Sequence, residues 1–162
     1  MIRVIYDSIR APYDIANILQ VVLAIGECEL HFTGNSLRHD HPKVLGKVKS
    51  WSSKIRKFGL PDLPIYYHAT LADCVKIMHD KGVKLIGTSS SSENSFFDLD
   101  LSRNNFAIVF GTEVGGLSIP KVALMNEMVY LPMSNEIDFM TLSIITPIVV
   151  YEIIRQQNSK KK

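Results

Sequence analysis

The chain has 162 residues, of which 46% are hydrophobic and 21% are charged. This length and composition suit one globular domain with a sizeable core, and they argue against a disordered chain. The formal net charge of +2 is too small to indicate nucleic-acid binding by itself, so the distribution of the charges matters more.

Apolar runs that suit strands alternate along the chain with spacings that suit helices. We expect strands at 2–6, 28–33, 65–68, 83–86, 105–110 and 127–131, and helices at 13–25, 71–81, 119–126 and 141–155, with one more helix in the basic segment that ends at Gly59. This alternation predicts an α/β fold with a mainly parallel sheet that helices flank on both faces. Residues 1–156 are expected to form one domain, and residues 157–162 a polar, lysine-rich tail.

The helix expected at 13–25 is apolar on almost every side. Its polar residues, Asp14, Asn17 and Gln20, are spaced three apart and therefore share one side of the helix. The border of a binding site and the solvent-exposed edge of a buried helix explain this stripe equally well.

Basic residues are concentrated between positions 38 and 57, where seven Lys or Arg stand against one acidic residue. A solvated helix face is the more common explanation, and contact with a phosphate backbone is the alternative. Trp51 and Phe58 within this segment are more typical of core anchors than of residues that stack on bases.

The most distinctive stretch, residues 108–118, reads Ile-Val-Phe-Gly-Thr-Glu-Val-Gly-Gly-Leu-Ser. An apolar strand ends at Gly111, and two further glycines give a turn whose backbone a ligand can approach closely. Ligands of open α/β sheets bind beyond the carboxyl ends of strands. A tight turn alone explains the glycines, but Glu113, for which packing gives no reason, favours a functional site.

The final helix, expected at 141–155, is apolar nearly all round. A chain of this size has little room to enclose such a helix, so we predict a subunit interface that includes it. Pro147 is expected to bend or locally break the helix. The polar residues after 155 are expected to fray.

Neither cysteines nor histidines show the spacing of a metal site, so we expect no metal and read Cys28 and Cys74 as reduced and buried. The first residues are typical of a strand and not of a signal peptide. The longest apolar run, 140–154, is shorter than the roughly 18 residues that span a bilayer. These features predict a soluble, cytoplasmic protein without a membrane partner.

Taken together, these patches resemble the SPOUT superfamily of methyltransferases, in the SpoU or TrmH branch that methylates ribose 2′-hydroxyl groups in RNA. The most specific parts are residues 110–118 and Leu131-Pro132-Met133, followed at family spacing by Ser143 and by Val150-Tyr151-Glu152. The resemblance covers most of the chain. It implies a C-terminal trefoil knot, which is an exception to the rule that chains do not thread loops. It also implies a homodimer, and S-adenosylmethionine held in a bent shape among the knot loops.

Carried over by position, the resemblance implies that backbone around Thr88, Gly111 and Leu131 holds the cofactor, and that Met133 and Met140 pack on it. Apolar walls with a few backbone donors and acceptors suit a nucleoside. Without the resemblance, core filling is the simpler explanation for the two methionines.

The chain departs from the family pattern in two motifs. The first helix of the family has an Asn and, six residues later, an Arg credited with activating the ribose hydroxyl and handling the phosphate, where this chain has Asp14 and Gln20. In the third motif the family's Ser-Leu-Asn becomes Phe-Met-Thr, which ends at Thr141. Glu113 and Ser143 match the family.

A ribose hydroxyl must lose its proton to accept a methyl group, so another residue has to take the role of the missing arginine if the protein is active. Arg10, in the loop before the first helix, is our candidate, and an ordinary surface arginine is the alternative. Together with Glu113, Thr141 and Ser143 it forms the predicted catalytic set. Four residues are expected to contact substrate: Asn17, Gln20, Arg38 and Lys43.

The resemblance implies an S-adenosylmethionine-dependent ribose 2′-O-methyltransferase acting on RNA. We expect tRNA as the substrate, because minimal family members without an added RNA-binding domain often act there. A second hypothesis is a knotted RNA-binding protein that binds the cofactor but is inactive alone or needs a partner, which Gln20 favours. A third, weaker hypothesis is a different nucleotide-binding α/β protein that shares only the glycine turn.

Overall fold

The computed structural model describes residues 1–103, 105–134, 136–137 and 139–159. The strands are β1 (Ile2–Asp7), β2 (Cys28–Thr33), β3 (Ile65–His68), β4 (Lys84–Thr88), β5 (Phe106–Phe110) and β6 (Glu127–Val129). The helices are α1 (Pro12–Ile25), α2 (Pro42–Trp51), α3 (Ser53–Phe58), α4 (Leu71–Asp80), α5 (Ile119–Val122) and α6 (Leu142–Ser159), with a 3-10 turn η1 (Phe96–Asp98).

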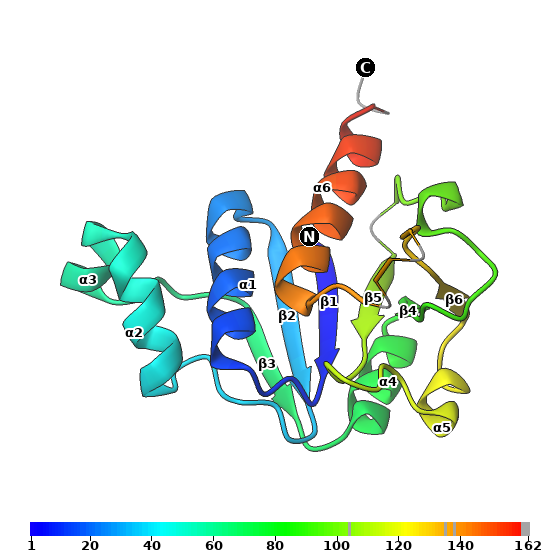
Figure 1. The fold of residues 1–162 in the computed structure, drawn as a ribbon, viewed down its shortest axis with the longest axis horizontal. Coiled ribbons are helices and arrows are strands. Elements are labelled where there is room, and N and C mark those ends of the chain that lie inside the picture. Colours follow the sequence, from blue (N-terminus) through cyan, green and yellow to red (C-terminus); the bar gives the residue numbers. More distant parts are fainter. Residues whose placement is uncertain (104, 135, 138, 160–162) are drawn as a thin grey trace.

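A parallel sheet of six strands forms the centre of the molecule, in the order β3-β2-β1-β5-β4-β6 (Figure 1). Helices α1 and α6 pack side by side on one face, α2 and α3 lie outside α1, and α4 covers the other face (Figure 1). The predicted α/β class with a mainly parallel, doubly covered sheet is therefore confirmed. No helix in the described ranges combines the length and apolar character that crossing a bilayer requires.

Side chains of β1 alternate between two apolar layers. Val4 and Tyr6 belong to the layer that α1 and α6 cover, whereas Ile5 belongs to the layer under α4. All three are fully buried, because a central parallel strand is covered on both faces. The free cysteines, Cys28 and Cys74, are also buried, as predicted.

The basic segment forms two short helices instead of the one expected. Ser52 separates them with an extended backbone, and its hydroxyl accepts a hydrogen bond from the N–H of Ile55 and so caps α3. Trp51 packs against the core as predicted. Phe58 does not, since its side chain is 71% exposed. The helix expected at 119–126 is also shorter, because α5 ends at Val122.

Helix α6 continues through Pro147 and on to Ser159, so the predicted local break is not found and residues 156–159 are not frayed. The hydroxyl of Thr146, one residue before the proline, donates to the carbonyl of Leu142 at 2.6 Å and accepts from Tyr6, which anchors this turn in the core. Near the other end, the side-chain oxygen of Gln156 accepts from the N–H of Leu101 at 2.7 Å. The bonds of Thr146 to Tyr6 and of Gln156 to Leu101 are tertiary contacts, and they explain why the helix persists past Pro147 and Arg155.

Candidate functional site

A pocket of about 360 Å³ lies beyond the carboxyl ends of β4 and β5, and we call it the glycine-turn pocket. It is lined by residues 88–90, 110–117, Leu131, Met133, Phe139, Met140, Leu142 and Ile145. All five residues predicted to hold the cofactor, Thr88, Gly111, Leu131, Met133 and Met140, are among them. The structure therefore brings three distant segments of the chain to one site.

The glycine turn is closed by its own backbone. Thr112 and Gly116 exchange two N–H···O=C bonds of 3.0 Å each, and the N–H of Gly115 donates to the Thr112 hydroxyl at 3.1 Å. Gly116 has a φ of 61°, which glycine adopts without strain. Gly111 has no room for a side chain, since a Cβ built there would lie 2.0 Å from the carbonyl carbon of Gly116. The glycines at these two positions are thus required by the turn itself.

Glu113 joins this turn to the loop that precedes α1. Its Oε1 accepts hydrogen bonds from the backbone N–H groups of Arg10, at 3.1 Å, and of Ala11, at 2.8 Å. These partners are more than 100 residues away along the chain. Glu113, for which the sequence gives no packing reason, therefore ties the glycine turn to the loop before α1.

Arg10 does not line the glycine-turn pocket. It lines a neighbouring hollow, the arginine pocket, together with residues 35–38, Asp40, His41 and Pro42. Arg38 in this pocket forms two hydrogen bonds with Asp40, at 3.0 and 2.9 Å, and lies over the ring of Tyr67. These bonds raise the pKa of Arg38 and hold the pKa of Asp40 below its usual value. Lys43 is exposed at the start of α2, next to this pocket.

A chain of hydroxyl groups connects the first turn of α6 to α1. Thr141 Oγ1 lies 3.2 Å from Ser143 Oγ, and the Ser143 hydroxyl in turn donates to the carboxylate of Asp14. Met140 and Leu142, on either side of Thr141, line the glycine-turn pocket. The predicted residues Thr141 and Ser143 are thus placed together at its margin.

The three polar residues of α1 do not share one environment. Asp14 contacts Ser143 and is half-buried, whereas Gln20 is exposed and Asn17 is half-buried. Neither Asn17 nor Gln20 lines the glycine-turn pocket or the arginine pocket. Only the first of the three polar positions therefore borders the site.

Several residues that the sequence did not single out contribute to the site. Ser89 and Ser90 line the glycine-turn pocket, and their position directly after β4 is the signal that points to them. Asp7 is 1% exposed at the end of β1, where it pairs with Lys121 and accepts from Thr33. This buried carboxylate fixes α5 beneath the glycine turn, and no sequence motif marks it.

The chain matches one protein-family model and several curated relatives. The model of the SpoU rRNA Methylase family matches residues 1–151. The 23S rRNA (guanosine-2′-O-)-methyltransferase RlmB of Xanthomonas axonopodis pv. citri is 27% identical over 158 residues, 94% of this chain and 58% of that protein. The tRNA (guanosine(18)-2′-O)-methyltransferase of Escherichia coli K12 is 22% identical over 161 residues, 98% of this chain and 65% of that protein. The chain therefore spans only about 60% of the length of these relatives.

Solved structures share the fold. The SpoU methyltransferase AviRb of Streptomyces viridochromogenes has a TM-score of 0.81 at 21% identity, over 99% of this chain and 61% of that one, and it has also been solved with AdoMet. A structure described for the 2-OH methylation of C/U34 on tRNA has a TM-score of 0.80 at 19% identity, over 98% of this chain and 97% of that one. The match of the family model to 1–151 decides the assignment: the chain belongs to the SpoU rRNA methylase family.

Proposed function

We propose that this chain is an S-adenosylmethionine-dependent RNA methyltransferase that transfers a methyl group to a ribose 2′-hydroxyl, with tRNA as the substrate class. The observation that carries the proposal is the glycine-turn pocket, in which all five predicted cofactor-binding residues meet. The tRNA methyltransferase of E. coli, whose match covers 98% of this chain, supports the substrate class.

The residues of the pocket suit the cofactor. Its walls combine the side chains of Leu131, Met133 and Phe139 with the backbone of a glycine turn, and apolar walls with a few backbone polar groups suit a nucleoside. Gly111 and Gly116 both line the pocket, and as glycines they expose backbone there that a ligand can approach closely. When bound, S-adenosylmethionine supplies a methyl group on a sulfonium, which needs a correctly placed oxygen nucleophile.

The residues of this chain then have distinct roles. Glu113 is a positioning residue, because its two hydrogen bonds fix the loop that carries Arg10 against the glycine turn. Arg10 supplies a permanent positive charge beside the site, and we assign it the role of the missing family arginine in holding the phosphate and favouring the ribose oxyanion. Ser143 donates to Asp14 and accepts from Thr141, so its oxygen keeps one lone pair that can accept a hydrogen bond from the ribose hydroxyl.

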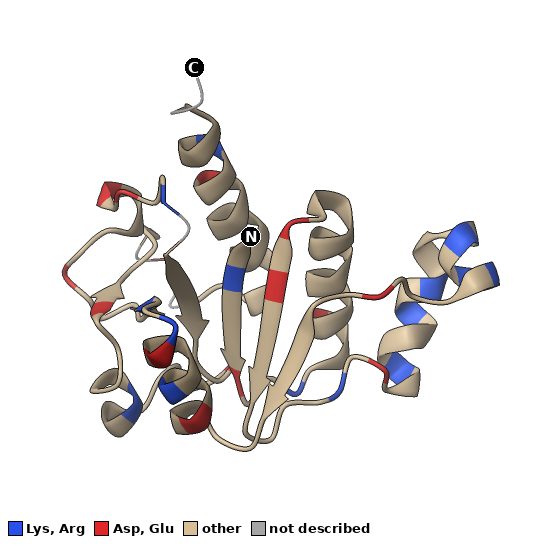
Figure 2. Ribbon diagram, turned by 180° about the vertical axis from the view of Figure 1, so that it is seen from behind, with Lys and Arg blue, Asp and Glu red and all other residues tan. Residues whose placement is uncertain are grey.

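Basic side chains on α2 and α3 give a surface for RNA phosphates. Figure 2 shows Lys and Arg gathered on these two helices, at one end of the molecule. Lys43, Lys49 and Lys54 are all exposed there. We propose that this surface, with Arg10 and Arg38, contacts the RNA backbone, because clustered lysines and arginines neutralise phosphates without reading sequence.

We also propose a homodimer that buries α6. Ile144, Ile148 and Tyr151 are 53%, 38% and 56% exposed, and their spacing of four and three residues puts them on one face of the helix. Phe139 and Tyr13, both 65% exposed, add to the apolar surface of this chain. Such a stripe is typical of a subunit interface. Light scattering should report twice the mass of the chain, and Tyr151→Glu should reduce it to one chain.

The methyl-transfer proposal is tested with the purified full chain, labelled S-adenosylmethionine and total tRNA. Wild type should transfer label to tRNA, and nuclease digestion should release 2′-O-methylated nucleotides. Arg10→Ala should lower the rate at least tenfold, whereas Lys76→Ala, an exposed lysine on α4 away from both pockets, should not. Full activity of Arg10→Ala would remove Arg10 from the mechanism. Labelling of a base instead of ribose would refute the reaction type.

A second function is favoured by one observation. Gln20 stands in the position of the family arginine and lines neither pocket. This supports the alternative that the chain binds cofactor and RNA but is inactive alone or needs a partner. Calorimetry separates the two: tight S-adenosylmethionine binding without any transfer to tRNA would favour the alternative.

The trefoil knot and the cytoplasmic location remain proposals that accompany the family assignment. The knot is supported by the path of the chain, because β6 is an edge strand next to β4 while α6, which follows it, packs against α1 on the other half of the sheet. An experimental structure that traced α6 outside the preceding loops would refute the knot. The location is supported by the proposed RNA substrate and by two free cysteines, and cell fractionation tests it.

A further inference from the structure

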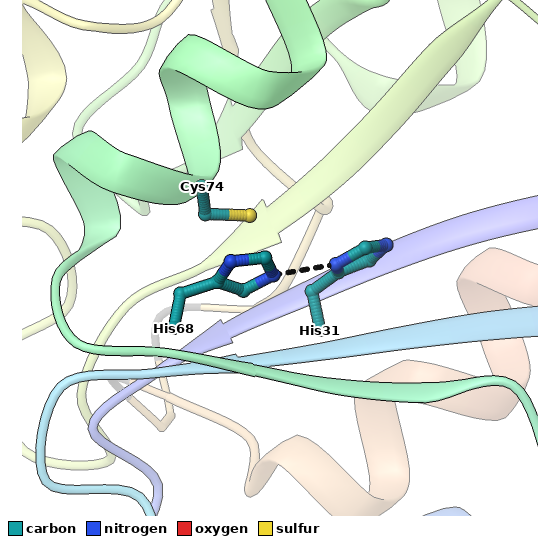
Figure 3. A group of neighbouring side chains, drawn as sticks. All are labelled: His31, His68 and Cys74. Carbon is teal, nitrogen blue, oxygen red and sulfur yellow. Dashed lines mark hydrogen bonds between the residues drawn. The ribbon is translucent and has the colours of Figure 1, made fainter.

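Two histidines and a cysteine meet on the face of the sheet that α4 covers (Figure 3). His31 comes from β2, His68 is the last residue of β3, and Cys74 lies on α4. One ring nitrogen of each histidine and the Cys74 sulfur all lie within 4.8 Å of one another. None of the three lines the glycine-turn pocket or the arginine pocket, so the cluster is separate from the proposed active site.

His31 is a buried polar side chain on this face of the sheet. Its neighbour on β1 is Ile5, and its ring stacks on the rings of Tyr66 and His68. His31 is only 2% exposed, and a buried polar ring costs free energy unless it is hydrogen-bonded. Its partners are Glu29 and His68. These partners hold the imidazole in a fixed orientation, as a metal-binding histidine requires.

The hydrogen bonds of His31 determine which nitrogen it presents to the cluster. Its Nε2 lies 2.7 Å from Oε1 of Glu29, and its Nδ1 lies 2.8 Å from Nε2 of His68. An ionised carboxylate only accepts, so we place the hydrogen of His31 on Nε2 and leave Nδ1 as an acceptor. A carboxylate that orients an imidazole in this way is the usual partner of a metal-binding histidine.

The state of the two imidazoles also suits a metal ligand. Burial lowers the pKa of both His31 and His68, which keeps the rings neutral at physiological pH. Neutral imidazole is the form that binds metal ions. Burial raises the pKa of the Cys74 thiol to about 12, which opposes metal binding, because the ion has to displace the thiol hydrogen.

We propose that His31 Nδ1, His68 Nε2 and Cys74 Sγ form a binding site for a divalent transition metal ion, and that Zn²⁺ is the ion they fit best. Two imidazoles and a thiolate are donors that Zn²⁺ prefers, whereas Mg²⁺ and Ca²⁺ require oxygen ligands. On binding, the hydrogen of His68 moves from Nε2 to Nδ1, and the thiol of Cys74 releases its hydrogen as a proton. Water can take the fourth position beside half-exposed His68.

The required movements are small. Tetrahedral zinc places two nitrogen ligands about 3.3 Å apart and a nitrogen and a sulfur about 3.5 Å apart. The 2.8 Å pair of ring nitrogens therefore has to widen slightly, and separations of up to 4.8 Å have to close toward these values. The proposal departs from our expectation of no metal, which rested on spacing alone. The three ligands lie on three elements, and no short motif links them.

The test uses the full chain purified without a polyhistidine tag and stripped of metal with a chelator. Titration with Co²⁺, which reports its ligands by absorption, should reach one ion per chain and show a thiolate-to-cobalt charge-transfer band. Zn²⁺ should displace Co²⁺ and raise the melting temperature, whereas Mg²⁺ should do neither. Absence of the charge-transfer band from wild type would overturn the proposal.

Variants identify the ligands. Cys74→Ser should abolish the charge-transfer band, and His68→Gln should weaken Co²⁺ affinity at least tenfold. Cys28→Ser is the matched control, because Cys28 is the other free, buried thiol and should leave the band unchanged. A band that persists in Cys74→Ser, or that is lost in Cys28→Ser, would refute the assignment. If Cys74→Ser does not fold, half-exposed His68 decides: unchanged affinity in His68→Gln refutes the site.

Discussion

The substitution Gly111→Ala tests the glycine turn most directly. A Cβ at this position would lie 2.0 Å from the carbonyl carbon of Gly116, 2.3 Å from its oxygen and 2.3 Å from the nitrogen of Leu117. Ordinary contact begins near 3.4 Å, so backbone atoms would have to separate by about 1.4 Å, the difference between 3.4 and 2.0. These atoms are backbone of the turn, and no side-chain rotation relieves the clash.

The expected loss of stability follows from the contacts that this backbone separation would disrupt. Overpacking of a tight site costs about 1–3 kcal/mol, and the two 3.0 Å bonds between Thr112 and Gly116 are each worth about 1 kcal/mol. We expect Gly111→Ala to lower the free energy of unfolding by about 3 kcal/mol, and to weaken S-adenosylmethionine binding by about a hundredfold, or roughly 2.7 kcal/mol.

Gly115→Ala is the matched control, because it changes the same turn at a place with room. A Cβ there meets only the Thr112 hydroxyl oxygen at 3.5 Å, which is ordinary contact, and its stability should change by less than about 0.5 kcal/mol. Urea denaturation gives the stabilities, and titration calorimetry gives the affinities. The reasoning is wrong if Gly111→Ala matches Gly115→Ala in both measurements.

Five further substitutions test three other features of the structure. Glu113→Gln keeps an acceptor for both N–H groups but loses the charge, so it should lower the free energy of unfolding by about 1 kcal/mol. Glu113→Ala removes the acceptor and should lower it by about 2–3 kcal/mol. Equal losses for the two variants in denaturation experiments would contradict this reasoning. Tyr6→Phe removes a buried 2.8 Å bond to Thr146 and should cost about 1 kcal/mol, whereas Thr146→Val, which strands the Tyr6 hydroxyl, should cost more. Burial lowers the pKa of His39, so as pH falls the imidazole takes up a proton in the unfolded chain before it does in the folded one. The free energy of unfolding should therefore decrease as pH drops below about 6.5. His39→Gln should make that decrease smaller, as measured by urea midpoints from about pH 7 to 5.

Local patterns predicted much of the fold. The runs at 28–33 and 65–68 correspond to β2 and β3 at the same residues, because buried strands bounded by turn residues leave a clear apolar signal. Pro147 was expected to bend or locally break α6. The helix is not broken there, and the hydrogen bond between Thr146 and Tyr6 holds this turn against the core. The prediction that Phe58 anchors the core was wrong, because an aromatic residue at the end of a short surface helix need not be buried.

The residues of the candidate site that the sequence pointed to are those that lie in a family motif. Met133 and Met140 line the glycine-turn pocket, although composition alone favours a core role for both. The hydrogen bonds of Glu113 to the loop before α1 span more than 100 residues, and local sequence does not encode such a partner. The same holds for His31 and His68, which are 37 residues apart and meet only because β2 and β3 pair.

The order in which the strands are made has a consequence for folding on the ribosome. β1 is synthesised well before one of its sheet neighbours, β5, which begins at Phe106, and the hydroxyl of Tyr6 in β1 meets Thr146 only 140 residues later. The centre of the sheet therefore stays incomplete until the first turns of α6 have emerged. Pairing between strands so distant in sequence is slow. Until β5 has been made, the edge of β1 that pairs with it stays exposed.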